Sequence, residues 1–434
     1  MKRVDQRGSI DPHDAIDHAW IGAADAAALL GVKRPTLYAY ASRGLVRSVS
    51  RGGRDRVYRR QDLERLRARS AARAGHAAVA AGALRWGEPV LDTALSSVAS
   101  GDLHYRGRSA AALARSGARF ETVAHWLWNG TWEAGARFPA VEPGIDLRAA
   151  ARVISPRAHP VDRLLALAAL LAATEAGDVG PEDDASAARM VRRLVAFLAV
   201  GRDDAAVHRA LAARTVAEAV LIAAGARGGV AARRAVDCAL VLMAEHELNA
   251  STFAARVAAG AGAELPACLV AALATLTGTG HGKSCDRVEA LFDEAREPED
   301  AARILRERRR RGDPVPAFGH PLYANGDPRT APMLEAAEAL APRNLVVRKA
   351  RAFVDTMALA GGEPPSIEVG LVAVAGALGM ERGGGAALMA LGRTAGWIAH
   401  VREQRAAGFT LRPRARYVGT APAASAGVAS SRPR

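Results

Sequence analysis

The feature that most constrains this chain is a long alanine-rich stretch, Gly75–Arg412, in which apolar residues recur at spacings of three and four. That spacing places apolar side chains along one face of an α-helix. Alternating Val, Ile and Thr patterns, which are typical of β-strands, are nearly absent from it. Aromatic residues make up only 5% of the 434 residues, so the core must consist mostly of Ala, Leu and Val. The stretch is therefore predicted to be mainly α, built from closely packed helices.

Several helices within this stretch can be predicted from their period and from the residues at their ends. Pro266 is expected in the first turn of a helix that runs to Thr277, because proline is favoured at that position. The glycines at 361–362 and 383–385 interrupt the pattern and predict loops. The most regular segments are Ala149–Val153, Pro160–Glu175, Asp184–Ala199 and Asp203–Ala224.

The N-terminal segment 19–74 is organised differently. Turn residues divide it into a helix at 24–30 that ends at Gly31, and a second helix that starts near Pro35 and ends at Gly44. Two short strands around glycines 52–53 and a third helix at 61–69 follow. Two helices joined by a tight glycine turn form a helix-turn-helix. The segments ALLGV, TLYAYASRGLV and RVYRRQDLERL resemble the winged helix-turn-helix of MerR-type and excisionase-like DNA-binding proteins.

This resemblance implies a second helix that enters the major groove of DNA and wing arginines that contact phosphates. Positive charge is concentrated in the same region, because residues 1–75 hold 16 Lys and Arg against 8 Asp and Glu, in a chain of net charge +14. The other interpretation is a docking or dimerisation element with a solvated arginine face. The residues expected at the groove or its rim are Arg34, Thr36, Tyr38 and Tyr40, and those expected at the phosphates are Arg51, Arg54 and Arg56.

Two of the three histidine-centred segments in the helical stretch are EHELNAS and TGTGHGKSCD. In the first, His246 and Asn249 are three residues apart and are expected on one face of a helix. In the second, glycines flank His281, and a helix is predicted at Asp286–Glu294. A histidine at a helix N-terminus is held neutral by the helix dipole, so its ring can donate a hydrogen bond without carrying charge.

The third segment, PVPAFGHPLYANGDPR, centres on His320. Asp327 is predicted to be the N-cap of the next helix, which places Arg329 in the first turn, where an anion can bind. Taken singly, each of the three histidines also fits a buried, hydrogen-bonded core position, whereas the three together favour a shared site. Metal binding is not predicted, because the chain has no HExxH motif and no Cys/His cluster.

In their order along the chain, these segments resemble the citrate synthase family over about Leu103–Gly419. EHELNASTFAARV resembles the family's oxaloacetate-binding helix, GTGHGK its GxxHGG loop, and FGHPLYANGDPR its FGHxxY…DPR signature. YRGRSAAALA, GRTAGWIAHVREQ and RPRARYVG match an early block, the closing helix and the C-terminal arm. The resemblance implies a two-lobed, all-helical domain whose small lobe closes over the large one. The expected divisions are a flexible N-terminus at 1–18, the winged module at 19–74, a large lobe at 75–284 and 383–419, a small lobe at 285–382, and a disordered tail at 420–434.

The family reaction implied by this resemblance is the condensation of acetyl-CoA, or another short acyl-CoA, with oxaloacetate, which yields citrate or an analogue and free CoA. A carboxylate base must remove a weakly acidic methyl proton while a neutral donor stabilises the enol. By motif match, His281 is this donor and His320 polarises the ketone. The CoA thioester is a substrate, and no cofactor is implied. The residues implied to hold oxaloacetate are His246, Asn249, Arg329, Arg393 and Arg412, and those implied to contact CoA are Val315, Ala317, Gly319 and Ser366.

The position of the base departs from the family motif PN(V/I)D, because the matching segment here is PSIEV. Glu368 therefore takes the place of the aspartate base, and Ser366 that of the asparagine. Glutamate is one methylene longer, and displacing a base by about 1 Å can cost on the order of 10²-fold in rate. The open alternatives are a site adjusted to the longer acid, weak activity, another substrate, or a buried or capping carboxylate in an inactive relative. Lys283 and Ala317 replace family glycines, and Lys283 lies either against a CoA phosphate or in solvent.

Two further alternatives concern arginines that the motifs assign to the site. Arg393 has small neighbours and could instead lie at the rim of a close helix crossing, and Arg412 could be a surface residue of the C-terminal arm. In the family, the arginine matching Arg412 reaches into the partner subunit, which implies a homodimer. A second function class is a DNA-binding regulator that uses the large domain as a metabolite or acyl-CoA sensor.

The cellular setting is predicted from what the chain contains. The three cysteines, Cys238, Cys268 and Cys285, have neither close pairing nor zinc spacing, which fits a reducing compartment. Residues 1–18 are polar, unlike a signal peptide, and no run of 18 apolar residues is uninterrupted. A cytoplasmic protein without a membrane span is therefore expected.

Overall fold

The computed structural model describes residues 20–52, 55–60, 62, 63, 66, 91–155, 157–174, 183–413, 415 and 419. The predicted N-terminus at 1–18, the tail at 420–434, Arg54 and most of the predicted helix at 61–69 lie outside the described residues, as does the side chain of Arg51.

The N-terminal module contains the predicted pair of helices, α1 (Ala23–Leu30) and α2 (Arg34–Ser42). Gly31 ends α1 in a left-handed conformation with φ of 65°, which glycine adopts without strain. The strands β1 (Trp20–Gly22), β2 (Ser48–Gly52) and β3 (Asp55–Arg59) form an antiparallel sheet in the order β1-β3-β2. The hairpin of β2 and β3 was predicted, whereas β1 was not.

A small core holds this module together. Ala26, Leu37, Val46, Tyr58 and Leu63 are buried and pack against one another. At its edge, Asp62 accepts hydrogen bonds from the backbone N–H and the guanidinium of Arg47, at 2.8–3.0 Å. The helix-turn-helix prediction is therefore confirmed, and the segment after β3 is tied to the segment before β2.

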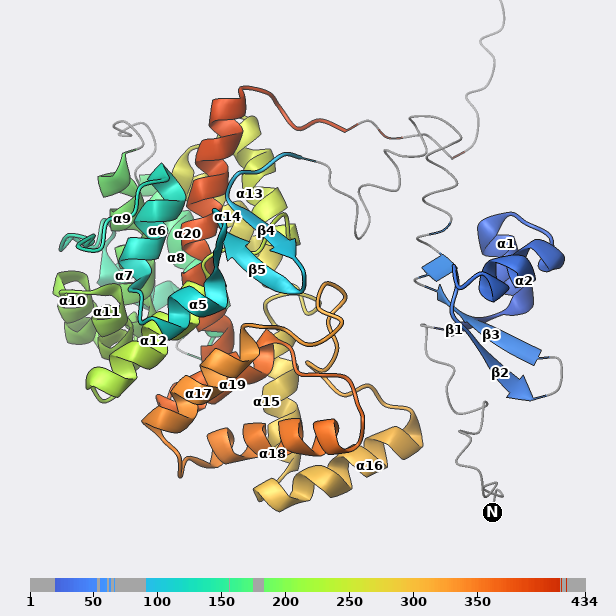
Figure 1. Cartoon of the computed structure of the whole chain (residues 1–434). Coiled ribbons are helices and arrows are strands. Elements are labelled where there is room, and N and C mark those ends of the chain that lie inside the picture. The colour runs from blue at the N-terminus through green and yellow to red at the C-terminus, as the bar shows by residue number, and fades with distance from the viewer. Residues whose placement is uncertain are drawn as a thin grey trace, which may run out of the picture.

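The rest of the described chain is mainly helical, as predicted (Figure 1). A short sheet, β4 (Ser96–Ala99), β5 (Asp102–Tyr105) and β6 (Arg108–Ser109), comes before the helices. The helices up to the second histidine segment are α5 (Ala110–Arg115), α6 (Phe120–Asn129), α7 (Leu147–Val153), α8 (Pro160–Thr174), α9 (Asp184–Ala196), η2 (Phe197–Ala199), α10 (Asp204–Ala212), α11 (Val216–Ala224), α12 (Val230–Met243), α13 (Ala250–Gly260) and α14 (Leu265–Leu276). The later ones are α15 (Ser284–Glu294), η3 (Pro298–Asp300), α16 (Ala301–Arg311), α17 (Thr330–Leu340), α18 (Leu345–Leu359), α19 (Ile367–Ala377) and α20 (Gly384–Ala407).

Three sequence predictions about this part were wrong. The segment Asp203–Ala224 is two helices, because Thr215 caps α11 by accepting a hydrogen bond from the backbone N–H of Glu218. The three-stranded sheet at residues 96–109 was not expected, since its strands are only two to four residues long. Of the glycines at 383–385, only Gly383 precedes α20, and the other two belong to its first turn.

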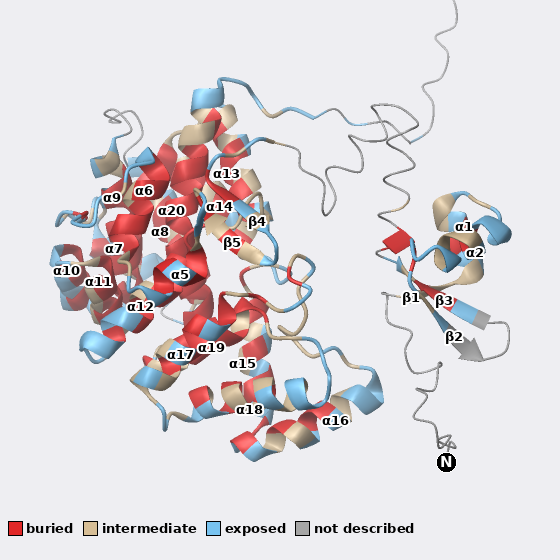
Figure 2. Ribbon diagram, viewed as in Figure 1, coloured by how far each residue is buried: buried red, intermediate tan, exposed pale blue. Residues whose placement is uncertain are grey.

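Helix α20 is the centre of the large group of helices. Every residue from Gly384 to Val401 is buried, and Figure 2 shows the helix red over most of its length. A helix that is buried on all sides needs small residues where neighbours approach closely. A Cβ added to Gly396 would lie 2.4 Å from the carbonyl oxygen of Ala244, so α12 can cross α20 at this point only because the residue is glycine.

Helices α15 and α19 pack against α20, α17 and α18 pack against α19, and α16 packs against α18 (Figure 1). Ion pairs join this group to α8: Lys283 donates to Asp162 at 3.1 Å, and His159 lies 3.1 Å from Asp286. Lys283 is therefore paired within the protein. The lobe boundaries at 284/285 and 382/383 stay predictions. Among the described residues, none of the helices is both long and apolar enough to span a bilayer.

Candidate active site

The three histidine segments, which are far apart in the sequence, meet in the folded chain. The rings of His246 and His320 lie 5.8 Å apart, centroid to centroid. The ring of Tyr323 is 4.9 Å from that of His320, and its hydroxyl is 2.8 Å from Nε2 of His246. His281, Arg329 and Arg393 all lie close enough to depress the pKa of His246. The structure thus brings together most of the residues assigned by the motifs.

His246 lies in the loop between α12 and α13 and not on a helix with Asn249, so the prediction of a shared helix face was wrong. Asn249 is instead the N-cap of α13, and its Oδ1 accepts from the backbone N–H of Thr252 at 3.2 Å. Its amide nitrogen donates to the carbonyl oxygen of His246 at 3.3 Å. Burial first, and then the charge of Arg329, hold the pKa of His246 well below its ordinary value. The ring is therefore neutral at pH 7.

His281 lies three residues before α15, and its Nε2 is 2.9 Å from the hydroxyl of Ser251. The predicted neutral state is present, but its main cause differs from the expected helix dipole. Burial, followed by the charge of Arg393, lowers the pKa of His281 to about 4. The Ser251 hydroxyl donates to Oδ1 of Asn249 at 2.6 Å and accepts from the indole N–H of Trp397 at 3.2 Å.

One backbone contact sets the tautomer of His320. The N–H of Leu322 donates to Nδ1 of His320 at 3.2 Å, so the neutral ring carries its proton on Nε2. Burial holds the pKa of His320 below its ordinary value, and the charge of Arg329 acts in the same direction. The ring is therefore a neutral hydrogen-bond donor through Nε2.

Two buried guanidinium groups add positive charge to this cluster. Arg329 is 2% exposed and forms a two-point contact with Asp327, with N···O distances of 2.9 and 2.7 Å. This pairing more than offsets the cost of burial and raises the pKa of Arg329. Asp327 also accepts from the backbone N–H of Arg329 at 3.0 Å. The predicted N-cap was therefore wrong: α17 begins at Thr330, Arg329 is its N-cap residue, and Asp327 fixes the turn before the helix.

Arg393, in the middle of α20, is 4% exposed, and burial lowers its pKa to about 10, which keeps it charged at pH 7. Nη1 of Arg393 and Nη1 of Arg329 are buried and have no hydrogen-bond partner among the described residues. Leaving a charged donor buried without an acceptor is costly. Two such donors beside three neutral imidazoles fit a bound carboxylate-bearing ligand.

Glu368 is in the first turn of α19, and its two carboxylate oxygens accept hydrogen bonds from two serine hydroxyls. Ser284 donates to Oε1 at 2.8 Å, and Ser366 donates to Oε2 at 2.5 Å. The negative charge of this carboxylate acts to raise the pKa values of His281 and His320, against the larger lowering that burial causes. The acid is therefore within electrostatic range of both rings. Among the described residues, its hydrogen bonds go to the two serines and not to a histidine.

The loop that carries the predicted CoA contacts runs beside the segment before α19. The backbone N–H of Gly319 donates to the carbonyl of Pro364 at 2.8 Å, and that of Ser366 to the carbonyl of Ala317 at 2.9 Å. Ala317 has φ of 59°, a strained value for a residue with a Cβ. Val315 and Ala317 pack partly against the main core. The N–H of Gly319 and the carbonyl of Ala317 are thus already hydrogen-bonded within the protein.

The remaining predicted residues lie away from the cluster. Arg412 is exposed on the arm after α20, which contacts the end of α13 through Thr410 and Gly260. Arg34, Thr36 and Tyr38 are exposed on α2, and Arg56 is exposed on β3. Tyr40, which was expected at the groove rim, packs partly against the core of the module.

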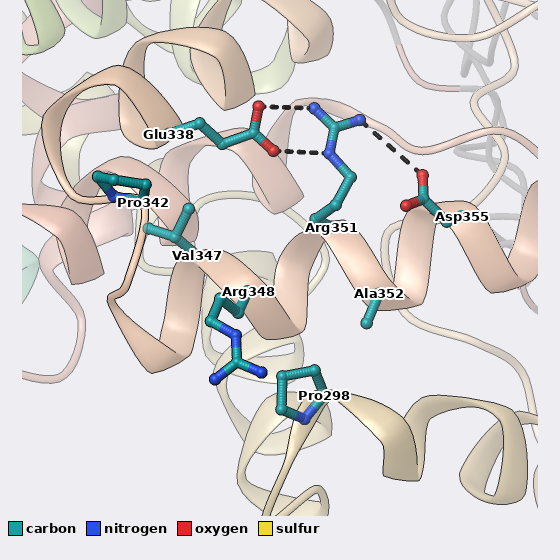
Figure 3. Close-up of a pocket in the computed structure, with 8 residues that line it drawn as sticks. All are labelled: Pro298, Glu338, Pro342, Val347, Arg348, Arg351, Ala352 and Asp355. Atoms are coloured by element: carbon teal, nitrogen blue, oxygen red, sulfur yellow. Dashed lines mark hydrogen bonds and ion pairs between the residues drawn. The ribbon is translucent and has the colours of Figure 1, made fainter.

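Two surface cavities contain none of the predicted residues. One, of about 440 Å³, lies between α18 and its neighbours, where Arg351 joins Glu338 and Asp355 (Figure 3). The other, of about 800 Å³, lies beside the ends of α13 and α20 and is lined in part by Arg256 and Glu403. Within the described ranges, no group of three or more His, Cys, Asp or Glu side chains is arranged to hold a metal ion.

The sequence interpretation missed Tyr323, Ser251 and Ser284. Tyr323 is 1% exposed and bonds His246, Ser251 faces His281, and Ser284 faces Glu368. Each lies two or three residues from a residue that was assigned, in a polar motif segment. Proximity to the motifs was the only available signal, because their partners come from other segments.

Comparison with known proteins agrees with this geometry. A helix-turn-helix domain model matches residues 20–71. The 2-methylcitrate synthase of Shewanella oneidensis is 28% identical to this chain over 77% of this chain and 94% of that protein. Citrate synthase 2 of Bacillus subtilis is 32% identical over 43% of this chain and 50% of that protein. The chain spans about half the length of the first curated relatives it matches.

Solved structures show the same fold. The citrate synthase of Thermoplasma acidophilum, in a ternary complex with carboxymethyl coenzyme A and oxaloacetate, is 25% identical with a TM-score of 0.66, covering 79% of this chain and 97% of that one. The citrate synthase of Thermotoga maritima, at 22% identity and a TM-score of 0.64, covers 77% and 94% and supports the fold alone. Because the model of the citrate synthase C-terminal domain matches residues 83–414, well over half of the chain, the chain belongs to the citrate synthase family.

Proposed function

We propose that this protein condenses a short acyl-CoA with oxaloacetate and then hydrolyses the thioester, releasing citrate or an analogue and free CoA. The observation that carries the proposal is the pair of buried, unpartnered guanidinium N–H groups of Arg329 and Arg393 beside His246 and His320. A dicarboxylate of the size of oxaloacetate would satisfy both cations. The ligands named for the Thermoplasma acidophilum protein support the same substrates.

The proposed reaction has three steps: proton removal, carbon–carbon bond formation and hydrolysis of the thioester. Glu368 takes a proton from the acyl carbon next to the thioester, and the C–H electrons form the enol double bond while the neutral ring of His281 stabilises the thioester oxygen. The enol carbon then attacks the ketone carbon of oxaloacetate, and Nε2–H of His320 stabilises the alkoxide that forms. The proton removed by Glu368 ends on this oxygen, which gives the hydroxyl and restores the Glu368 carboxylate. Water finally cleaves the thioester, giving the carboxylate and the CoA thiol. Neutral imidazoles suit this task because they donate hydrogen bonds without adding repulsive charge beside the arginines.

The relatives support two different acyl-CoA substrates, and the choice between them is open. Relatives named citrate synthase support acetyl-CoA, and the Shewanella oneidensis relative supports propionyl-CoA. The test is the release of CoA thiol from each acyl-CoA with oxaloacetate, with His281→Ala as the control. If neither acyl-CoA gives more thiol than this variant does, the proposal is wrong.

We further propose that the enzyme acts as a homodimer in which Arg412 of one protomer completes the site of the other. Exposure of Arg412 in the single chain, on an arm that contacts the end of α13, supports this assignment. Sedimentation of the full chain measures the association. In a mixture of Arg412→Ala and Arg393→Gln chains, partial recovery of activity is expected, because one kind of site in the mixed dimer has both arginines.

The second candidate function is DNA binding by the N-terminal module, with acyl-CoA or oxaloacetate as the signal. Its support is the helix-turn-helix match at 20–71 and the exposure of Arg34, Thr36 and Tyr38 on α2. Sequence-selective, salt-dependent DNA binding that changes with oxaloacetate is the expected result. Absence of DNA binding at low salt would leave the module as a docking or dimerisation element.

A further inference from the structure

Glu368 is held by two serines that come from different segments of the chain. Ser284 is the first residue of α15, and Ser366 is the N-cap of α19. They donate to different oxygens of the carboxylate, at 2.8 and 2.5 Å, and both serines are buried, with exposures of 7% and 3%. The carboxylate is therefore fixed at both oxygens.

The behaviour of Ser366 as a helix cap is unusual for this chain. A serine at an N-cap normally accepts a hydrogen bond from a backbone N–H of the first turn. Ser109 does so at the start of α5, accepting from Ala112 at 3.2 Å. Ser366 makes no such bond, and its hydroxyl donates to Glu368 instead. Its side chain thus serves the acid and not the helix.

The backbone of each serine is tied to another part of the site. The N–H of Ser284 donates to the carbonyl of His281 at 3.0 Å, and the N–H of Ser366 donates to the carbonyl of Ala317 at 2.9 Å. Ser284 therefore joins Glu368 to the histidine loop, and Ser366 joins it to the loop of the predicted CoA contacts. A shift of either loop is passed directly to the carboxylate.

We propose that Ser284 and Ser366 are positioning residues that place the Glu368 carboxylate against the acyl group. Glutamate has one more rotatable bond than the aspartate of the family motif, and two hydrogen bonds to different oxygens remove that freedom. Each carboxylate oxygen has two acceptor sites, so one serine on each leaves a site free to take a proton. The proposal rests on the proposed function and adds how a longer acid serves as its base.

The test compares Ser284→Ala, Ser366→Ala and the double variant with the wild type. We expect kcat to fall about 10-fold in each single variant and on the order of 10²-fold in the double variant, with the KM for oxaloacetate unchanged. With methyl-deuterated acyl-CoA, the isotope effect on kcat should rise in the variants, because proton removal becomes slower. Ser366→Thr keeps the hydroxyl and should restore most of the activity. Ser109→Ala, which removes an ordinary cap serine, is the matched control and should leave kcat unchanged.

Binding of carboxymethyl coenzyme A in the presence of oxaloacetate gives a readout that needs no turnover. Its carboxymethyl group replaces the acyl group, so the double variant should bind it about 10-fold more weakly, while oxaloacetate alone binds equally to both proteins. Wild-type values of kcat, isotope effect and analogue affinity in the double variant would overturn the serine proposal and leave the proposed function intact. A wild type that neither releases CoA nor binds the analogue would overturn the proposed function and this proposal with it.

Discussion

The two parts of this protein use arginine in opposite ways. On the N-terminal module, Arg34 and Arg56 are exposed and lie on short, contiguous elements. In the helical body, Arg329 lies in the turn before α17 and Arg393 in the middle of α20. Both are almost completely buried, and each keeps an N–H group without a hydrogen-bond partner among the described residues. An exposed arginine contributes to long-range attraction that salt weakens, whereas a buried one makes short, directed contacts in a low dielectric. The same residue type thus fits binding of a polyanion in one part and recognition of a small anion in the other.

Loss of the base should have the largest effect. Glu368→Gln keeps the size of the side chain and can still accept from one of the two serines, but it cannot accept the proton. We expect kcat to fall by about 10³-fold, with little change in the KM for oxaloacetate, measured by CoA thiol release. DNA binding by the module should be unaffected. A fall of less than about 10-fold would assign the base to another group.

A buried arginine should come next. Arg393→Gln removes a charged donor from the proposed oxaloacetate site, so the KM for oxaloacetate should rise about 10- to 100-fold. Arg402→Gln, whose guanidinium pairs with Asp184, is the matched control on the same helix and should leave this KM within about twofold of wild type. Equal effects of both substitutions would point to the packing of α20 and not to anion recognition.

Exposed arginines of the module should give a smaller, salt-dependent effect. Arg34→Ala combined with Arg56→Ala should weaken DNA binding and reduce the slope of log affinity against log salt by roughly 1, because the phosphate contact of Arg56 is lost. Loss of Arg34 from the groove should weaken sequence selectivity. The rate of condensation should stay the same. A change in kcat would show that the two parts of the protein are coupled.

The buried histidines should make folding stability depend on pH. The pKa of His281 is about 4 in the folded chain and near 6.5 when unfolded, so the unfolded state takes up a proton first as the pH falls. The contribution of His281 to the free energy of unfolding is present above about pH 6.5 and is lost as the pH falls from there to about pH 4. Between pH 7 and pH 5, wild type should lose about 1–2 kcal/mol more unfolding free energy than His281→Gln. The check is urea unfolding of both proteins at the two pH values, and equal slopes with pH would contradict the assignment.

A capping residue of the body should have the smallest effect. Thr215→Ala removes the cap of α11 and should lower the unfolding free energy by about 1 kcal/mol, without changing KM or kcat. Thermal unfolding monitored by circular dichroism measures the loss. A change in KM or kcat would contradict this prediction, because it would extend the site to α11, where no described residue contacts the histidine cluster.

Most of the fold could be predicted from local patterns. The periods of α7, α8 and α9 and the glycine stop of α1 depend on residues adjacent in the chain, so their bounds agree with prediction to within three residues. The break at Thr215 was missed because a cap of one residue competes weakly with a long apolar period. His246 was placed on a helix for the same reason, although Glu247, with φ of 51°, interrupts the backbone there.

The sequence by itself determined the helical class, the basic winged module and the choice of side chains that the motifs assign to the site, because these depend on residue type and near-neighbour spacing. Only the tertiary structure decided how those side chains behave. Burial beside Arg393, more than any helix dipole, makes His281 neutral, and Leu322 sets the tautomer of His320. Ser284 and Ser366 reach Glu368 from two helix starts that are more than 80 residues apart. Desolvation and long-range hydrogen bonds arise only when distant segments pack together, and no local pattern records them.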